Sequence, residues 1–208
     1  MRSCAKVFPA SVDLKNPSAE LGEWDKSFYE KKLVKKKYDY DPQALKEYFS
    51  TDKCVEAVLK TYEKIYDLQF KKVEGKYWAA EVDHYDVLSN GKKIGEFYLD
   101  LYPRPDKYQH AAAWGLVPHK LFDDGREQLP VGALVANFPR PLPDRPSLLS
   151  INDVETLYHE FGHIMHQTLT RAPYASLSGT SVAQDFVEAP SQMLENWVWS
   201  PSVLKIIS

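Results

Sequence analysis

The sequence predicts an α+β fold that is mainly helical and contains one small β-sheet. Two observations lead to this prediction. Apolar residues recur at helical spacing in the first and last thirds of the chain, whereas the middle third consists of short runs rich in aromatic and β-branched residues. The order of helices, then strands, then helices is typical of α+β proteins. The 208 residues, 44% hydrophobic and 26% charged, suit one globular domain or a tight pair.

Composition also excludes several classes of protein. Lys plus Arg is 26 and Asp plus Glu is 29, so the net charge of −3 gives no basic surface for nucleic acid. No apolar run approaches the ~20 residues that cross a bilayer, and the first residues lack the apolar core of a secretory signal. Cys4 and Cys54 are too few for a disulfide framework. We therefore expect a cytoplasmic protein with reduced thiols, with a mitochondrial or plastid location as the alternative.

The first third is predicted to be helical after an extended lead-in. Residues 1–23 contain Pro9 and Pro17 and show no sustained periodicity, so we expect the folded domain to occupy residues 24–208. Asp25 is the expected N-cap of the first helix. Asp41 followed by Pro42 predicts the start of a short helix. A longer helix follows from Thr51 or Asp52, where apolar residues form one stripe from residue 55 to residue 66.

The middle of the chain is predicted to form the sheet. Asn90-Gly91 is the strongest hairpin signal in the sequence. The expected strands cover residues 69–73, 77–82, 85–88, 94–101, 110–117 and 131–138. Proline recurs through residues 139–146 and makes that segment a loop.

A helix over residues 150–169 is predicted next, with Ser150 as its N-cap. It contains His159-Glu160-Phe161-Gly162-His163, an HEXXH motif. Residues four apart on a helix project within about 40° of each other, so both imidazoles can bind one Zn²⁺. Glu160 lies at the edge of the same face, where its carboxylate can take a proton from a water held by the metal. Glycine within a helix is unfavourable, so Gly162 indicates a packing or close-approach requirement.

A third protein ligand is expected from residues 178–199, which read as a second helix carrying Asp185, Glu188 and Glu195. Glu188 is the preferred ligand, because Pro190 would kink or restart the helix beside it. Glu195 is the alternative. Asp185 and Gln192, on the same face as Glu188, suit hydrogen bonds to a metal-bound imidazole.

The other histidines have weaker claims on a metal. His166 follows His159 by seven residues and is predicted to lie beside the site or line its pocket. His84, His110 and His119 have no partners at metal spacing, so each is expected to be an ordinary surface or core residue.

Several segments together resemble peptidase family M3, the metallopeptidases of the thimet oligopeptidase and oligopeptidase A type. The segments that carry the resemblance are HEFGHIMHQ, SGTS, DFVEAPSQMLENW, EWDKSFYEKK, IGEFYLDLYPRPDKYQHAA, VANFPRP and LLSINDVETLYHEFGH. The resemblance implies a zincin-like core with the sheet packed beside the HEXXH helix. It implies one zinc ion per chain held by His159, His163 and Glu188, with Glu160 as general base. The implied substrates are short peptides, for which residues 110–117 are the candidate edge strand.

Family members are several times longer than this chain and have a downstream segment that supplies a His and Tyr residues to the substrate. We therefore expect a shortened form with an exposed apolar groove, covered by a partner or a missing segment. The leading hypothesis is a zinc-dependent metalloendopeptidase. The alternatives are a catalytically impaired form that binds zinc or peptides, and a helical domain with a chance HEXXH sequence that binds no metal.

Overall fold

The computed structural model describes residues 22–39 and 42–207, with side chains from residue 44 onward in the second range. The chain divides into two units, Met1–Ala44 and Leu45–Ser208, a division later than the boundary expected at residue 23. The predicted lead-in, apart from its last two residues, lies outside the described residues, as do Cys4 and the predicted cap Asp41.

The first unit contains helix α1 (Glu23–Tyr38), and helix α2 (Pro42–Leu45) crosses the division. The prediction of Asp25 as the N-cap of α1 was wrong, because Gly22 occupies the cap position. Asp25 lies three residues into the helix, and its carboxylate accepts a hydrogen bond from the Gly22 N–H at 3.1 Å. Asp25 thus satisfies a free N–H at the helix start from within the first turn.

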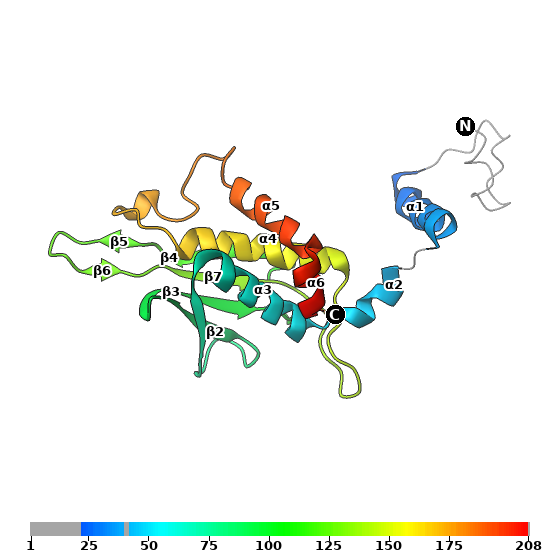
Figure 1. Ribbon diagram of the computed structural model, residues 1–208, viewed down its shortest axis with the longest axis horizontal. Helices are drawn as coiled ribbons and strands as arrows, with labels where there is room; N and C mark the ends of the chain where they lie inside the picture. Colours follow the sequence, from blue (N-terminus) through cyan, green and yellow to red (C-terminus); the bar gives the residue numbers. More distant parts are fainter. Residues whose placement is uncertain (1–21, 40–41, 208) are drawn as a thin grey trace. The chain divides into compact units, whose positions relative to one another are not determined.

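The second unit is built on a five-stranded sheet in the order β1-β2-β3-β7-β4 (Figure 1). Neighbouring strands are antiparallel except β3 and β7, which are parallel. The strands are β1 (Gln69–Val73), β2 (Asp83–Ser89), β3 (Lys92–Asp100), β4 (Ala112–Val117) and β7 (Val131–Val135), and β5 (Lys120–Leu121) and β6 (Glu127–Gln128) form a separate hairpin. Strand β4 is therefore an edge of the main sheet, although it precedes β7 in the chain.

The hairpin prediction at Asn90-Gly91 is confirmed. Strands β2 and β3 pair antiparallel, with Ser89 opposite Lys92. The φ angles of Asn90 and Gly91 are 50° and 75°, which are the left-handed values that a tight two-residue hairpin turn requires.

The predicted strand over residues 77–82 was wrong. Because β1 and β2 pair antiparallel, with Val73 opposite His84, the chain must reverse direction between them. Residues 74–82 make that reversal, and the Val82 N–H donates to the Ala79 carbonyl within it. Tyr77 and Trp78 in this segment form side-chain hydrogen bonds, to the Val73 carbonyl and the Asp100 carboxylate, and their main chain does not belong to a strand.

The helices of the second unit surround α4 (Ile151–Thr168), which contacts β3, β4 and β7 as it runs along the sheet (Figure 1). The other helical elements are η2 (Lys46–Tyr48), α3 (Thr51–Tyr66), η3 (Ala175–Leu177), α5 (Ala189–Glu195), η4 (Asn196–Trp199) and α6 (Pro201–Ile207). The predicted N-cap of α4 is confirmed, because Ser150 Oγ accepts from the Asp153 N–H and Asp153 Oδ2 accepts from the Ser150 N–H.

The core fixes the orientation of α4 through its apolar face. The buried ring of Phe161 packs edge-on against Phe70, Phe97 and Tyr62, with ring centroids 4.9–5.7 Å apart. Tyr62 also donates from its hydroxyl to the Tyr158 carbonyl at 2.9 Å. Strands β1 and β3 and helix α3 thus hold one side of α4, which leaves the side with the histidines free to face α5.

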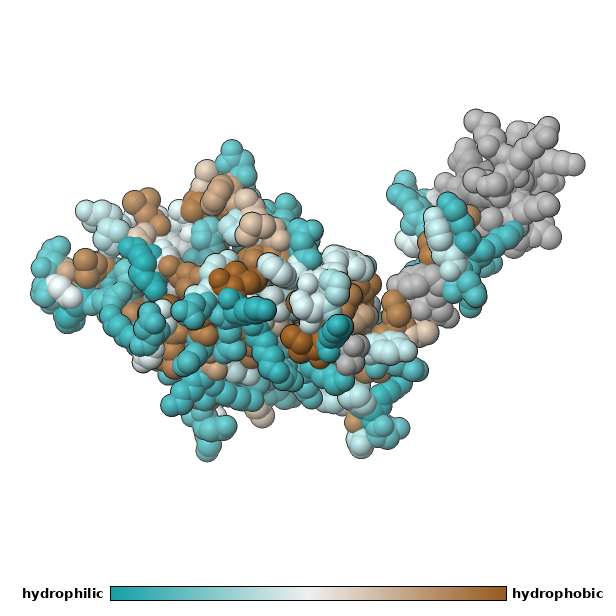
Figure 2. All heavy atoms as spheres, viewed as in Figure 1, coloured by the Kyte–Doolittle hydropathy of each residue, from teal (hydrophilic) through white to brown (hydrophobic). Residues whose placement is uncertain are grey.

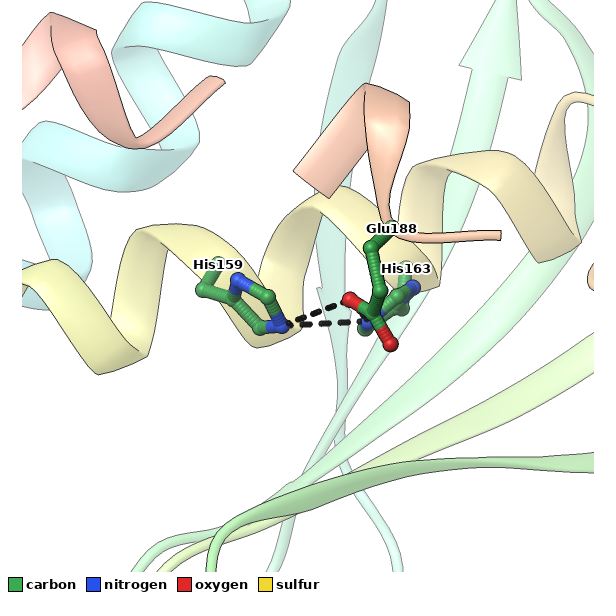
Figure 3. A group of neighbouring side chains, drawn as sticks. All are labelled: His159, His163 and Glu188. Carbon is green, nitrogen blue, oxygen red and sulfur yellow. Dashed lines mark hydrogen bonds and ion pairs between the residues drawn. The ribbon is translucent and has the colours of Figure 1, made fainter. Parts of the chain in front are cut away.

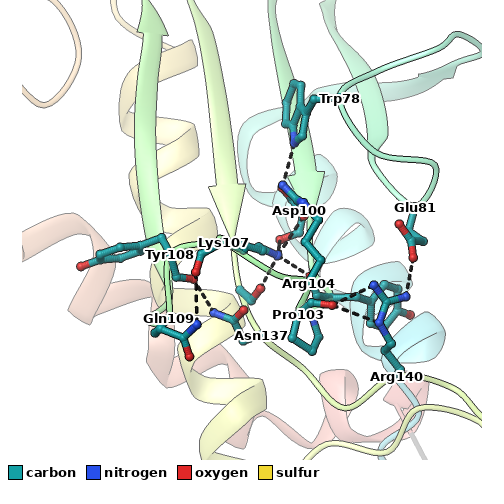
Figure 4. Close-up of polar contacts among 12 residues, drawn as sticks. Trp78, Glu81, Asp100, Pro103, Arg104, Lys107, Tyr108, Gln109, Asn137 and Arg140 are labelled. Atoms are coloured by element: carbon teal, nitrogen blue, oxygen red, sulfur yellow. Dashed lines mark hydrogen bonds and ion pairs between the residues drawn. The ribbon is translucent and has the colours of Figure 1, made fainter.

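Buried ionic contacts join the ends of β3 and β7 to the loop that leads into β4 (Figure 4). Lys107, which is 7% exposed, donates to the carbonyls of Asp100, Tyr102 and Ala136 and pairs with the Asp100 carboxylate at 2.8 Å. Asp100 also accepts two bonds from the Arg104 guanidinium and one from the Trp78 indole. Burial opposes ionisation of Asp100, but these donors outweigh it and lower its pKa to about 2.

An apolar groove of about 440 Å³ lies between α3, η4 and α6. Its lining side chains include Ile65, Trp197, Val203 and Ile206. Figure 2 shows apolar side chains at the surface around α3 and α6. That a partner or a further segment covers this groove stays a prediction. Among the described residues, no helix has both the length and the apolar character needed to span a membrane.

Candidate metal centre

Three predicted ligands converge on one point between α4 and the start of α5 (Figure 3). The Nε2 atoms of His159 and His163 lie 3.2 Å apart. The Oε2 atom of Glu188 lies 3.2 Å from the first of these nitrogens and 3.1 Å from the second. The one-turn spacing of the histidines on α4 brings the imidazoles together, and α5 brings the carboxylate from a segment 25 residues further along the chain.

The triangle of donor atoms has the size that a tetrahedral zinc site requires. Ligand atoms about 2.0–2.1 Å from a tetrahedral ion are about 3.3 Å from one another. The three observed separations are close to this value. Two imidazoles and one carboxylate are also a ligand set found at catalytic zinc, with the fourth position left open.

A carboxylate beside His159 determines which of its nitrogens can bind a metal. Glu195 Oε1 lies 2.5 Å from His159 Nδ1, and a carboxylate only accepts hydrogen bonds, so Nδ1 donates. In the neutral imidazole, Nε2 then carries a lone pair directed at Glu188 and His163. A divalent cation at the centre of these three atoms would have two imidazole nitrogens and one carboxylate oxygen as ligands.

The backbone around Glu188 explains how its side chain is aimed. The prediction of one helix over residues 178–199 was wrong, because the chain turns through residues 184–188 and α5 begins at Ala189. Pro190 therefore lies in the first turn of α5, where its missing N–H costs no hydrogen bond. Ser191 donates from Oγ to Glu188, with the main-chain oxygen at 2.9 Å and Oε2 at 3.0 Å.

Gly162 allows α5 to approach α4 closely. A Cβ at this position would lie 2.8 Å from the Cα of Ser191 and 3.3 Å from its Cβ, closer than packed atoms tolerate. Ser191 is fully buried in this contact. The packing requirement expected for Gly162 is therefore confirmed, and its effect is to place Glu188 within reach of the two imidazoles.

Glu160 is half-buried beside the ligands. Burial raises the pKa of its carboxyl and the nearby Glu188 raises it further, whereas His159 and the Ala113 N–H act in the opposite direction. A cavity of about 380 Å³ opens in front of Glu160. It is lined by Asn152, Glu155, Thr156, His159, Glu160 and Glu195. Burial lowers the pKa of His163, which favours the neutral form that ligates metals.

The side chains predicted to hydrogen-bond the metal-binding residues do not do so in the structure. Within the described part of the chain, Glu195 holds Nδ1 of His159, whereas Asp185 and Gln192 are exposed. His166 lines a separate cavity of about 370 Å³, and its buried Nδ1 has no hydrogen-bond partner among the described residues. Glu195 and Ser191 are thus the supporting residues that sequence reasoning did not assign. The seven-residue spacing of Glu195 from Glu188, two helical turns, was the available signal for Glu195.

The remaining described histidines have other roles. The prediction that His84 has no partners at metal spacing was wrong, because the pairing of β2 with β3 brings it beside Asp86 and Glu96, with ligand atoms close enough for a metal. However, Lys93 already pairs with both carboxylates, at 2.6 and 2.9 Å, and supplies the cation there. His119 is buried beside the Ala172 carbonyl and Glu127, and His110 is exposed.

A family model described as peptidase family M3 matches residues 4–208 of this sequence. The chain belongs to peptidase family M3. Its resemblance to this family at the motifs around α4 and α5 therefore extends over nearly the whole sequence.

Curated M3 relatives show how much of such a protein the chain represents. A thimet-like oligopeptidase from Dictyostelium discoideum is 40% identical over 185 residues, which are 87% of this chain and 28% of that protein. Oligopeptidase A from Salmonella typhimurium is 37% identical over 91% of this chain and 28% of its own length. A mitochondrial intermediate peptidase from Arabidopsis thaliana is 34% identical over 91% of this chain and 28% of its own length. The chain thus spans about 28% of the length of these relatives.

Proposed function

We propose that this chain carries the metal centre of a zinc-dependent metalloendopeptidase of the oligopeptidase type, which hydrolyses short peptides. His159, His163 and Glu188 would hold one zinc ion in a zincin-like arrangement. The observation that carries the proposal is the convergence of these three donor atoms within 3.1–3.2 Å of one another. Names of the relatives support peptides as the substrate class.

The residues around the three ligands suit peptide hydrolysis. Zinc, when bound, supplies a Lewis acid that lowers the pKa of water and polarises a carbonyl oxygen. Glu160 takes the proton from the attacking water and returns it to the leaving amine. Its raised pKa makes it a better base than an exposed carboxylate, and its position in the lining of a cavity gives substrate access.

Strand β4 is the proposed site for the main chain of the peptide. It forms an edge of the sheet, contacts the helix that carries the motif, and exposes Trp114 and Leu116. An extended peptide can add to such an edge as a further strand. Helix α4 contacts β4, so a peptide on β4 would pass close to the helix that carries the general base.

The test combines metal content with turnover. We expect elemental analysis to find one zinc per chain after dialysis, and a quenched-fluorescence peptide to be cleaved. Glu160→Gln should lower cleavage by about 10²–10⁴-fold with zinc retained, because the amide cannot take the proton. Asp185→Asn is the control, since this carboxylate is exposed and lies outside the lining of the cavity.

A second candidate function is zinc or peptide binding without turnover. It requires only the three converging donor atoms and the free edge of β4. Folded, zinc-loaded protein that binds peptides and does not cleave them would support it over the peptidase. Folded protein that binds neither zinc nor peptides would contradict both functions.

A further inference from the structure

Gln167 is a buried polar residue on α4 that the proposed chemistry does not use. It lies one turn beyond His163 and two turns beyond Glu160, and it is 5% exposed. In the amide orientation that satisfies both contacts, its Nε2 donates to the Trp114 carbonyl at 3.2 Å. Its Oε1 then accepts from the Gly115 N–H at 3.3 Å. The side chain therefore binds the main chain of two successive residues of β4.

These bonds fall where β4 is irregular. Gly115 lies opposite Gly132 of β7, but the next paired residue is Val117, opposite Val131. Leu116 is the extra residue of a β-bulge, which bends a strand and changes the direction of its edge groups. Gln167 thus holds β4 at the residue where the bulge begins.

Three glycines leave the space that the Gln167 side chain occupies. A Cβ at Gly132 would lie 2.7 Å from the end of its amide, and a Cβ at Gly179 would lie 3.2 Å from its Cα. At Gly115 the corresponding distance to the amide is 3.8 Å. Strands β4 and β7 and the loop at residue 179 therefore all present bare backbone to this side chain.

We propose that Gln167 is a positioning residue that sets the bulge of β4 and so aligns its free edge with the metal centre. Gln167 binds Trp114 and Gly115 from the same helix that carries the HEXXH motif, so α4 links the strand to the metal centre. The position of this bulge would determine the register in which a peptide pairs with β4. The role rests on the proposed peptidase function, because it requires a peptide on β4.

The test uses two readouts on the full chain loaded with zinc. The first is hydrogen exchange at the Gly115 amide, which Gln167 should protect. The second is binding of a blocked pentapeptide of alanine and phenylalanine, measured by calorimetry in a Glu160→Gln background that prevents cleavage. Gln167→Met keeps the length of the side chain and removes both hydrogen bonds. It should speed Gly115 exchange and weaken peptide binding about tenfold, with zinc affinity unchanged.

Two further variants separate positioning from packing. Thr168→Val, at the neighbouring buried residue whose hydroxyl bonds the Ile164 carbonyl, is the matched control and should change neither readout. Gly132→Ala should reproduce the effect of Gln167→Met, because the new methyl group displaces the intact amide.

The outcomes distinguish this role from the proposed function. Unchanged Gly115 exchange in Gln167→Met, or faster exchange with unchanged peptide affinity, would overturn the positioning role alone. If the chain with Gln167 intact failed to bind the peptide, the proposed function would be overturned, and this role with it.

Discussion

The Glu195 carboxylate acts on the candidate metal centre through His159. Its contact with Nδ1 at 2.5 Å makes that nitrogen the donor, and Nε2 faces Glu188 and His163. Carboxylates of this kind orient an imidazole and raise its basicity as a ligand. Asp185 and Gln192 were predicted for this role, but Asp185 lies in the turn before α5 and both side chains are exposed.

We predict that Glu195→Ala lowers zinc affinity by about 10–100-fold, because His159 loses the partner that fixes its tautomer and orientation. Titration against a competing chelator measures the affinity. Asp185→Ala is the control, since this exposed carboxylate should leave affinity unchanged. Equal affinities for the Glu195 variant and the unmodified protein would refute the assigned role.

The contact between α4 and α5 decides whether the carboxylate reaches the imidazoles. Helix propensity alone favours alanine over glycine by about 1 kcal/mol within a helix. At Gly162 this preference is outweighed, because the added Cβ would lie 2.8 Å from the main chain of α5. Gly162 therefore lowers the intrinsic stability of α4 as a helix but allows α4 to pack closely against α5.

Gly162→Ala is therefore expected to destabilise the fold by about 1–3 kcal/mol, the usual range for overpacking a well-filled contact. It should also weaken zinc binding, because α5 and Glu188 move away from the histidines. Urea unfolding and chelator titration measure the two effects. Gln192→Ala, an exposed change on α5, is the control; increased stability of Gly162→Ala would contradict the packing role.

At the scale of the whole molecule, Asp100 and Lys107 join β3, β7 and the loop that leads into β4. This junction holds the edge strand from its N-terminal end, whereas Gln167 holds its bulge. Both ends of the proposed peptide-binding strand are thus fixed by buried polar contacts.

The folded-state pKa of Asp100 is about 2, below its ordinary value of 3.8. Ionised Asp100 therefore stabilises the fold above pH ~4, and this contribution is lost as the pH falls through about 2. We expect it to be on the order of 2 kcal/mol. Urea unfolding at pH 5 and at lower pH should show that Asp100→Asn is less stable than the unmodified protein and that the difference shrinks with acid. Asp185→Asn is the control, and a difference that does not vary with pH would contradict the assignment.

The convergence of His159 and His163 on α4 could be predicted from the sequence, because residues within one helical turn determine each other's position. The same holds for the Ser150 cap and the Asn90-Gly91 turn. The strand order could not be predicted, because β7 lies between β3 and β4 through contacts that no local pattern records. The compartment stays a prediction.

Local chain geometry was enough to pair the two histidines of the HEXXH motif, since helical spacing is the same in every context. The likeness to peptidase family M3 rested on the sequence segments themselves. The close approach at Gly162, the partner of His159 and the contacts of Gln167 with β4 depend on segments distant in sequence. Such contacts arise only when the core packs, because packing rather than spacing decides which side chains meet.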